Sequence, residues 1–432
     1  VTASPSCSPA PVSPCPSHRR GAGAVKATPT QGCDRAPSVG LPHWSTMTDT
    51  DAAGGPPSTD RPQTSTRDHD ALTERLSAWL AARPGFTHGV VRELAAPSTN
   101  GMSSETLLFD AEWTDAEGDH HDRCVARLEP EMTAVPVFPT YDLELQYRVM
   151  NLVGERTSVP VPRTLWFEPD RGAVGSPFIV MGRVDGVVPP DVMPYPFGDN
   201  WLFDAHPDDQ RRLQDRSVAV LAELHSLEAT DEELAFLDTK APGDTPLRRH
   251  VNGQRAFYDW TRGAGTPDEI RLPVIEATFD WLDEHWPEDE GETVISWGDG
   301  RIGNMIYRDF EPVAALDWEM AALGPRELDL AWMIFIHRFF QDLAEEYGMP
   351  GMPSYLHRDD VAATYESLSG HTARDLDWYL MYAALRHGVV MTRTAQRGVH
   401  FGERDAPEDP DDYVMHRRTI ERMLAGTYWD SI

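Results

Sequence analysis

The chain has 432 residues, of which 40% are hydrophobic and 13 are tryptophans, so it can bury the core of one large bilobal domain or of two smaller domains. Its 38 basic residues against 70 acidic ones argue against a nucleic-acid partner, because phosphate backbones are held by basic surfaces. No stretch approaches the roughly 18 consecutive apolar residues of a membrane helix, and no apolar block follows the arginines near the N-terminus. We therefore expect no membrane span and a cytoplasmic location.

The first 66 residues are dense in Pro, Ser, Thr, Gly and Ala and show no apolar periodicity. Such a segment cannot bury enough surface to offset the entropy of ordering, so we predict a disordered leader at residues 1–66. Two interpretations stay open: a flexible tail, or an over-extended reading frame with translation starting at Met47. Three of the four cysteines lie here, and we expect no disulfide framework.

After the leader, short segments alternate between helical and strand periodicity. We predict a helix, two strands joined by a polar turn at 115–122, a second helix and a further strand, at residues 71–80, 105–113, 123–128, 141–153 and 177–183. From about Pro190 the pattern is mainly helical. This order predicts an α+β, protein-kinase-like bilobal fold, with a small antiparallel β-rich N-lobe at 67–186 and a larger helical C-lobe at 187–432.

The most informative segment is residues 294–319. An apolar strand delivers Asp299 into a glycine-rich loop, Asn304 follows five residues later, and a hairpin turning at 309–312 delivers Asp317. Phosphoryl transfer needs a carboxylate that orients the attacking hydroxyl and oxygen ligands that hold Mg²⁺. We predict Asp299 as the catalytic base and Asn304 and Asp317 as metal ligands. The alternative is that both aspartates only cap turns.

This segment resembles the aminoglycoside-phosphotransferase family, whose loop reads H-G-D-x-x-x-x-N, followed by an I-D-W/F-E-like element and G-x-P-x-x-D-L-A. The last element stands at 324–331, one residue tighter between its Gly and Pro. The resemblance implies ATP-dependent transfer of the γ-phosphate to a hydroxyl of a small molecule, with Mg²⁺, and it implies that Asp329 anchors the catalytic hairpin. Gly324-Pro325 follows Asp317 within eight residues, which leaves no room for the peptide-docking segment of a protein kinase.

The resemblance also implies a phosphate clamp. Arg127 stands where kinases have a strand lysine, and a guanidinium can donate to phosphate through two prongs. The helix position expected to hold the pairing glutamate is Gln146, and Glu144 lies about 200° around a helix from it. Which of the two meets Arg127 stays open.

Two further nucleotide contacts follow from the resemblance. A loop of small residues including Ser103 is expected to cover the phosphates. The hinge at 180–184, with Met181 and Arg183, is expected to contact adenine, or guanine if GTP is used, through its main chain.

Two features leave alternatives open. Trp297 replaces the family's loop histidine, and it could brace the loop by packing. Together with Gln146 it also motivates the alternative, a nucleotide- or ligand-binding pseudokinase without turnover. The closest-looking relatives are kinase-like domains associated with certain acyl-CoA dehydrogenases, which suggests hydroxyacyl acceptors, whereas an antibiotic or another metabolite is not excluded. His225, in a Leu-His-Ser-Leu signature, is predicted to be structural. The sequence does not indicate an oligomeric state.

Overall fold

The computed structural model describes residues 67–97, 105–130, 135–263 and 269–429. The predicted leader at 1–66 and the predicted phosphate-loop residue Ser103 lie outside these residues. Among the described helices, none combines the length and the apolar character needed to cross a membrane.

The N-terminal part is built on one antiparallel sheet with strand order β1-β2-β3-β5-β4. Its strands are β1 (His88–Ala95), β2 (Glu105–Asp115), β3 (Gly118–Leu128), β4 (Thr164–Glu168) and β5 (Phe178–Gly182). β2 and β3 pair as far as Asp115 opposite Gly118, so their turn has two residues and is shorter than the predicted 115–122 segment. The start of β3 is polar and lies outside the core on both faces, which is why its sequence resembles a turn.

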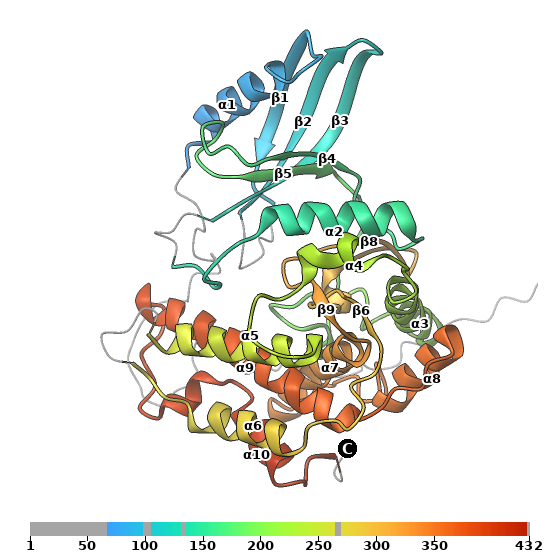
Figure 1. The fold of residues 1–432 in the computed structure, drawn as a ribbon, viewed down its shortest axis with the longest axis vertical. Coiled ribbons are helices and arrows are strands. Elements are labelled where there is room, and N and C mark those ends of the chain that lie inside the picture. The colour runs from blue at the N-terminus through green and yellow to red at the C-terminus, as the bar shows by residue number, and fades with distance from the viewer. Residues whose placement is uncertain (1–66, 98–104, 131–134, 264–268, 430–432) are drawn as a thin grey trace, which may run out of the picture. The chain divides into compact units, whose positions relative to one another are not determined.

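Two helices pack on this sheet, α1 (His69–Ala81) against β1 and α2 (Leu143–Arg156) against β4 and β5 (Figure 1). Successive side chains of a strand point to opposite faces. In β5, Phe178 and Val180 accordingly join a core with α1, whereas Ile179 and Met181 join a second core with α2 and the C-terminal helices. Strand β5 is therefore buried on both faces.

The C-terminal part is mainly helical, as predicted, with two short antiparallel strand pairs, β6 with β9 and β7 with β8. Its helices of more than one turn are α3 (Pro207–Leu224), α5 (Pro246–Gly263), α6 (Pro273–Glu284), α7 (Glu327–Glu346), α8 (Arg358–Ser369), α9 (Leu376–His400) and α10 (Arg417–Leu424). The strands are β6 (Thr293–Ser296), β7 (Met305–Arg308), β8 (Glu311–Ala315) and β9 (Ala322–Pro325). An antiparallel sheet followed by a helical half confirms the predicted α+β bilobal fold.

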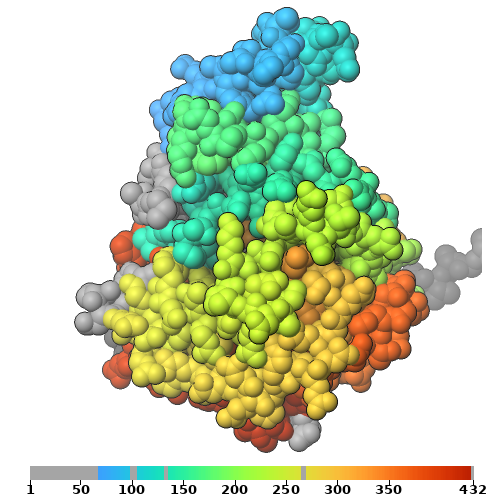
Figure 2. Space-filling view, in the orientation of Figure 1, coloured from blue at the N-terminus to red at the C-terminus, as the bar shows by residue number. Residues whose placement is uncertain are grey.

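Helix α2 is also tied to the short segment formed by α4 (Asp231–Leu234) and the 3₁₀ turn η3 (Ala235–Leu237). The Arg148 guanidinium lies 4.0 Å from the ring centre of Phe236, and Arg156 pairs with Glu233 at 2.6 Å. On the face shown in Figure 2, this yellow-green segment lies directly against the teal of α2. The helix of the β-rich half thus packs on both halves.

Replacing Leu80 by alanine should lower the free energy of unfolding by about 2–5 kcal/mol, because Leu80 is fully buried between α1 and the sheet and its removal leaves a cavity. Urea denaturation followed by tryptophan fluorescence measures the change. Glu74→Ala, on the exposed side of the same helix, is the matched control and should change stability little. Equal effects of the two substitutions would contradict the packing role of α1.

Candidate active site

The three predicted chemical residues lie on one strand-loop-hairpin unit. Asp299 follows β6, Asn304 precedes β7, and Asp317 follows β8. The β7–β8 hairpin turns at Asp309 and Phe310, whose φ values of 53° and 62° suit the primed turns of tight hairpins. The N–H of Leu316 donates to the carbonyl of Asn304 at 2.8 Å, so the hairpin brings Asp317 back beside Asn304.

Asp329 anchors this unit from the first turn of α7, as the resemblance implied. Its fully buried carboxylate accepts from the N–H of Trp297 at 2.7 Å, the N–H of Gly298 at 2.9 Å and the hydroxyl of Ser296 at 2.9 Å. His225 adds a fourth contact at 3.0 Å, which confirms its structural role. Burial alone would raise the pKa of Asp329, but the hydrogen bonds and charge from His225 and the main-chain donors outweigh it and hold the pKa below its ordinary value.

Gly298 is required where the loop leaves Asp329. Its φ is 86°, a region that side chains rarely allow, and an added Cβ would overlap the carbonyl of Met320. The loop therefore passes the next segment too closely for any side chain at this position.

Trp297, which stands in place of the family's loop histidine, is fully buried. Its indole N–H donates to the carbonyl of Leu316 at 3.0 Å, and its ring stacks on Trp318 with ring centres 5.2 Å apart. Trp297 therefore braces the loop against the hairpin that carries Asp317, by packing and by one hydrogen bond.

The Asp299 carboxylate is held by three donors. Oδ1 accepts from the indole N–H of Trp332 at 2.6 Å and from Nε of Arg301 at 3.1 Å, and Oδ2 accepts from Nδ2 of Asn304 at 2.6 Å. Nδ2 of Asn304 also donates to the Asp299 carbonyl at 3.0 Å. Since both of these partners are acceptors, the amide must present its nitrogen to Asp299, and its oxygen remains for another ligand.

Asp317 is hydrogen-bonded to Arg127, the predicted phosphate clamp. Both terminal nitrogens of Arg127 donate to Asp317 Oδ1, at 3.1 and 3.0 Å, and one of them also lies 3.4 Å from Glu319 Oε2. Burial would lower the pKa of Arg127, but the two carboxylates outweigh it and raise that pKa. Asp317 has a φ of 60°, a strained conformation of the kind found at functional sites and tolerated by aspartate.

Helix α2 presents its two candidate residues to different surroundings. Glu144 is exposed, whereas Gln146 is 1% exposed and its Nε2 is buried without a hydrogen-bond partner among the described residues. A buried amide without a partner is costly, and a phosphate oxygen would satisfy it.

The predicted hinge is a strand end. Met181 lies in β5, opposite Val125 of β3 and Thr164 of β4. The N–H of Arg183 donates to the carbonyl of Arg123 at 2.8 Å, so only the carbonyl of Arg183 is left for a base. The Arg183 side chain lies 3.6 Å from Asp185.

The donor set fits a magnesium ion shared with a nucleotide. Within the described residues, no group of three or more His, Cys, Asp or Glu side chains could hold a metal by itself. Magnesium is usually held by one or two carboxylates together with substrate phosphates. Asp317 and the amide oxygen of Asn304 match that pattern.

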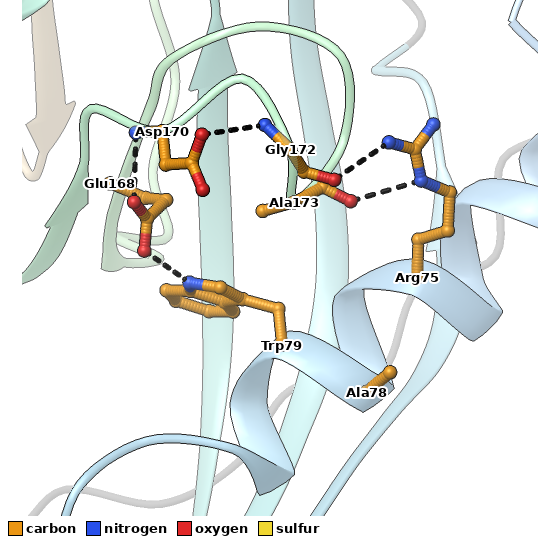
Figure 3. A pocket seen from close by; sticks show the side chains of 7 residues that line it. All are labelled: Arg75, Ala78, Trp79, Glu168, Asp170, Gly172 and Ala173. Carbon is orange, nitrogen blue, oxygen red and sulfur yellow. Dashed lines mark hydrogen bonds between the residues drawn. The ribbon is translucent and has the colours of Figure 1, made fainter.

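A surface hollow of about 380 Å³ lies elsewhere, between α1 and the segment after β4 (Figure 3). Its polar groups contact one another: Trp79 donates to Glu168 at 2.8 Å, and Arg75 donates to the carbonyl of Ala173 at 2.9 Å. Because its lining is satisfied internally, we assign it no ligand.

Comparison with known proteins shows the family to which the chain belongs. Residues 119–369, more than half of the chain, match the phosphotransferase enzyme family, so the chain belongs to that family. A solved "putative aminoglycoside phosphotransferase" from Ralstonia eutropha has the same fold, with a TM-score of 0.56 and 20% identity over 83% of this chain and 98% of that one.

Two relatives of known sequence are named as acyl-CoA dehydrogenases. The chain is 24% identical to the "Probable acyl-CoA dehydrogenase IBR3" of Arabidopsis thaliana, over 76% of this chain and 39% of the relative. It is 29% identical to acyl-CoA dehydrogenase family member 11 of Gallus gallus, over 46% of this chain and 23% of the relative. The chain thus spans less than half the length of these relatives.

The structure brings the predicted acids together with groups that sequence reasoning missed. Trp332 and Arg301 contact Asp299, and Glu319 shares Arg127 with Asp317. Arg386, buried in α9, donates to the carbonyl of Gly298 at 2.9 Å. Arg301 and Glu319 lie within the motif segment at 294–319, and that position is the sequence feature that could have identified them. Nothing in the local sequence marks Trp332 or Arg386.

Replacing Asp329 by alanine should destabilise the protein by about 3–5 kcal/mol, because His225 and two main-chain N–H groups would lose their buried acceptor. Thermal and chemical unfolding measure the loss. Glu346→Ala, an exposed substitution in the same helix, is the control. A small loss would show that the loop does not depend on Asp329.

The pKa of Asp329 gives a second readout. Because its folded pKa is depressed, its contribution is complete above the unfolded value and is lost as the pH falls through the folded value. The Asp329→Ala variant should therefore approach the stability of the original protein at low pH and differ most near neutrality.

Proposed function

We propose that the protein transfers the γ-phosphate of ATP to a hydroxyl group of a small molecule. The observation that carries this proposal is the convergence of Asp299, Asn304 and Asp317 on one rigid loop and hairpin, with Arg127 reaching them from the β-sheet. Membership of the phosphotransferase enzyme family supports the same reaction class.

Asp299 is proposed to orient the acceptor hydroxyl and to accept its proton as the oxygen attacks the γ-phosphorus in line with the leaving oxygen of ADP. Its three donors fix the position of the carboxylate, which suits it to orient the acceptor hydroxyl. No phospho-enzyme intermediate is required.

The nucleotide is proposed to lie between Arg127, Gln146 and the Asn304–Asp317 pair. The Asn304 amide oxygen and Asp317 would hold Mg²⁺, whose positive charge would neutralise the phosphate oxygens. Arg127 then gives part of its hydrogen bonding to phosphate, and Nε2 of Gln146 gains an acceptor.

A binding protein without turnover is the second candidate, which Trp297 and Gln146 first suggested. Because Trp297 braces the loop without a histidine, its presence is a weaker argument for a protein without turnover. The acceptor stays unassigned. Hydroxyacyl compounds, which the likeness to acyl-CoA dehydrogenases suggests, are the first class to screen, followed by aminoglycosides and other hydroxylated metabolites.

Asp299→Ala should lower kcat by about 10²- to 10⁴-fold while leaving Mg·ATP affinity nearly unchanged, because it removes the group that orients the nucleophile. Asp317→Ala should weaken Mg·ATP binding by about tenfold or more, because it removes a metal ligand. Calorimetry with ATP and with GTP, with and without Mg²⁺, measures binding without knowledge of the acceptor.

Three outcomes separate the candidates. Metal-dependent binding that the Asp317 variant loses, together with turnover, supports the enzyme. Metal-dependent binding without turnover of any acceptor, water included, supports the pseudokinase. No nucleotide binding under any condition overturns the enzyme and leaves a kinase-like protein that binds some other ligand.

Arg127→Ala should raise the apparent KM for ATP by about 10- to 100-fold, since a buried charged hydrogen bond is worth about 1.5–3 kcal/mol. Steady-state kinetics at saturating Mg²⁺ measures it. Arg163→Ala, an arginine with 66% exposure that pairs with Asp122 on the same sheet, is the control and should leave KM unchanged. A normal KM in the Arg127 variant would place the clamp elsewhere.

A further inference from the structure

One guanidinium, that of Arg301, stands between two carboxylates from distant parts of the chain. Nε of Arg301 donates to Asp299 Oδ1 at 3.1 Å, and Nη1 donates to Asp191 Oδ2 at 2.6 Å. The side chains of Arg301, Asp299 and Asp191 are 20%, 18% and 34% exposed, so the contacts are largely shielded from solvent. Shielded ion pairs are less weakened by water and salt than surface ones.

Asp191 belongs to the segment that joins the sheet to the helical half. Its neighbours Val188 and Val192 are 39% and 52% exposed, whereas Oδ1 of Asp191 is buried and has no hydrogen-bond partner among the described residues. Orienting a carboxylate inward in this way is costly unless its other oxygen is firmly paired. Arg301 supplies that pairing.

The same connection is fixed to the catalytic hairpin at a second point. Val187 exchanges main-chain hydrogen bonds with Tyr307 of β7, at 2.9 and 2.8 Å. The connection therefore cannot shift without disturbing both β7 and the Asp191–Arg301 pair.

Gly303 provides the room for this arrangement. A Cβ at position 303 would overlap Nη1 of Arg301 and would lie 2.7 Å from Oδ1 and 2.9 Å from Oδ2 of Asp191. A side chain at 303 would thus require Arg301 or Asp191 to shift from this arrangement.

We propose that Arg301 is a positioning residue which, held by Asp191 of the inter-lobe connection and admitted by Gly303, fixes the orientation of the Asp299 carboxylate. The proposal rests on the proposed function for its kinetic consequences but not for its geometry. It makes the rate of phosphoryl transfer depend on a contact made outside the catalytic loop.

The reason is geometric. Trp332 and Asn304 hold one oxygen each, and Arg301 adds a second donor to Oδ1 from another direction. Without the anchor on Asp191, the long Arg301 side chain regains rotamer freedom, and Asp299 loses a fixed partner. The proposed nucleotide contacts do not involve Asp191, so the affinity for ATP should stay unchanged when the rate of transfer falls.

The test is a double-mutant cycle on Asp191→Asn and Arg301→Gln, read out by slow hydrolysis of Mg·ATP, in which water takes the place of the acceptor. Each single variant should lower kcat about tenfold with KM within about twofold, because small misplacements of a catalytic group have effects of this order or larger. The double variant should lose no more than Arg301→Gln alone, since both changes break one chain of contacts. Arg301→Lys should recover part of the rate.

Asp185→Asn is the matched control, because Asp185 lies in the same connection and pairs with Arg123 at the surface, with 57% and 48% exposure. It should leave kcat and KM unchanged. Unchanged kcat in the Asp191 variant, or multiplied losses in the double variant, would overturn the proposal. Thermal unfolding of each variant verifies that the fold is retained.

Failure of the proposed function is recognised separately. If the original protein does not hydrolyse Mg·ATP, whether or not it binds it, crystal structures of the original protein and the Asp191→Asn variant decide the positioning role. An Arg301 side chain turned away from Asp299 in the variant supports it. An Arg301–Asp299 contact kept at its original distance overturns it.

Discussion

The site depends first on the buried carboxylate of Asp329. Four donors from three elements converge on it: the end of β6, the start of the catalytic loop and His225 at the end of α3. A buried charge is tolerated only when it is paired and hydrogen-bonded, so removing any of these partners would leave an uncompensated group. The carboxylate therefore fixes α7, α3 and the loop relative to one another, and Asp299 directly follows Gly298, whose N–H donates to this carboxylate.

The other contacts extend the same frame. Trp297 joins the loop to the hairpin through Leu316, Leu316 joins the hairpin to Asn304, and Asn304 joins back to Asp299. These bonds form a closed circuit in which each chemical residue is held by its neighbour's main chain or side chain. Such preorganisation allows oxygen ligands to act without rearrangement at the moment of reaction. The circuit is complete within the C-terminal half, and the sheet adds Arg127, which donates to Asp317.

Periodicity and motif spacing were sufficient to predict the fold order, the helices at 71–80 and 141–153, and the convergence of Asp299 with Asn304. They did not predict β1 or the full length of β3. The polar outer part of β3 lacks the alternation of polar and apolar residues that marks a strand. They also could not give Trp332, Arg386 or Asp191, since contacts across more than thirty residues depend on helix packing that no local pattern records. Local sequence identifies chemical groups, whereas tertiary packing decides what orients them.

The preference for arginine over lysine at position 127 has a physical explanation in the same geometry. Two carboxylates, Asp317 and Glu319, lie within reach of one cation, and a planar guanidinium can serve both through separate N–H groups. A lysine ammonium is a compact point charge and would sit on one of them. A nucleotide phosphate bound with Mg²⁺ could then accept a hydrogen bond from one terminal nitrogen of Arg127, while the other nitrogen stays bonded to its carboxylate. Arg127 would therefore have a partner throughout. Arginine at position 127 is thus compatible with the proposed phosphoryl transfer.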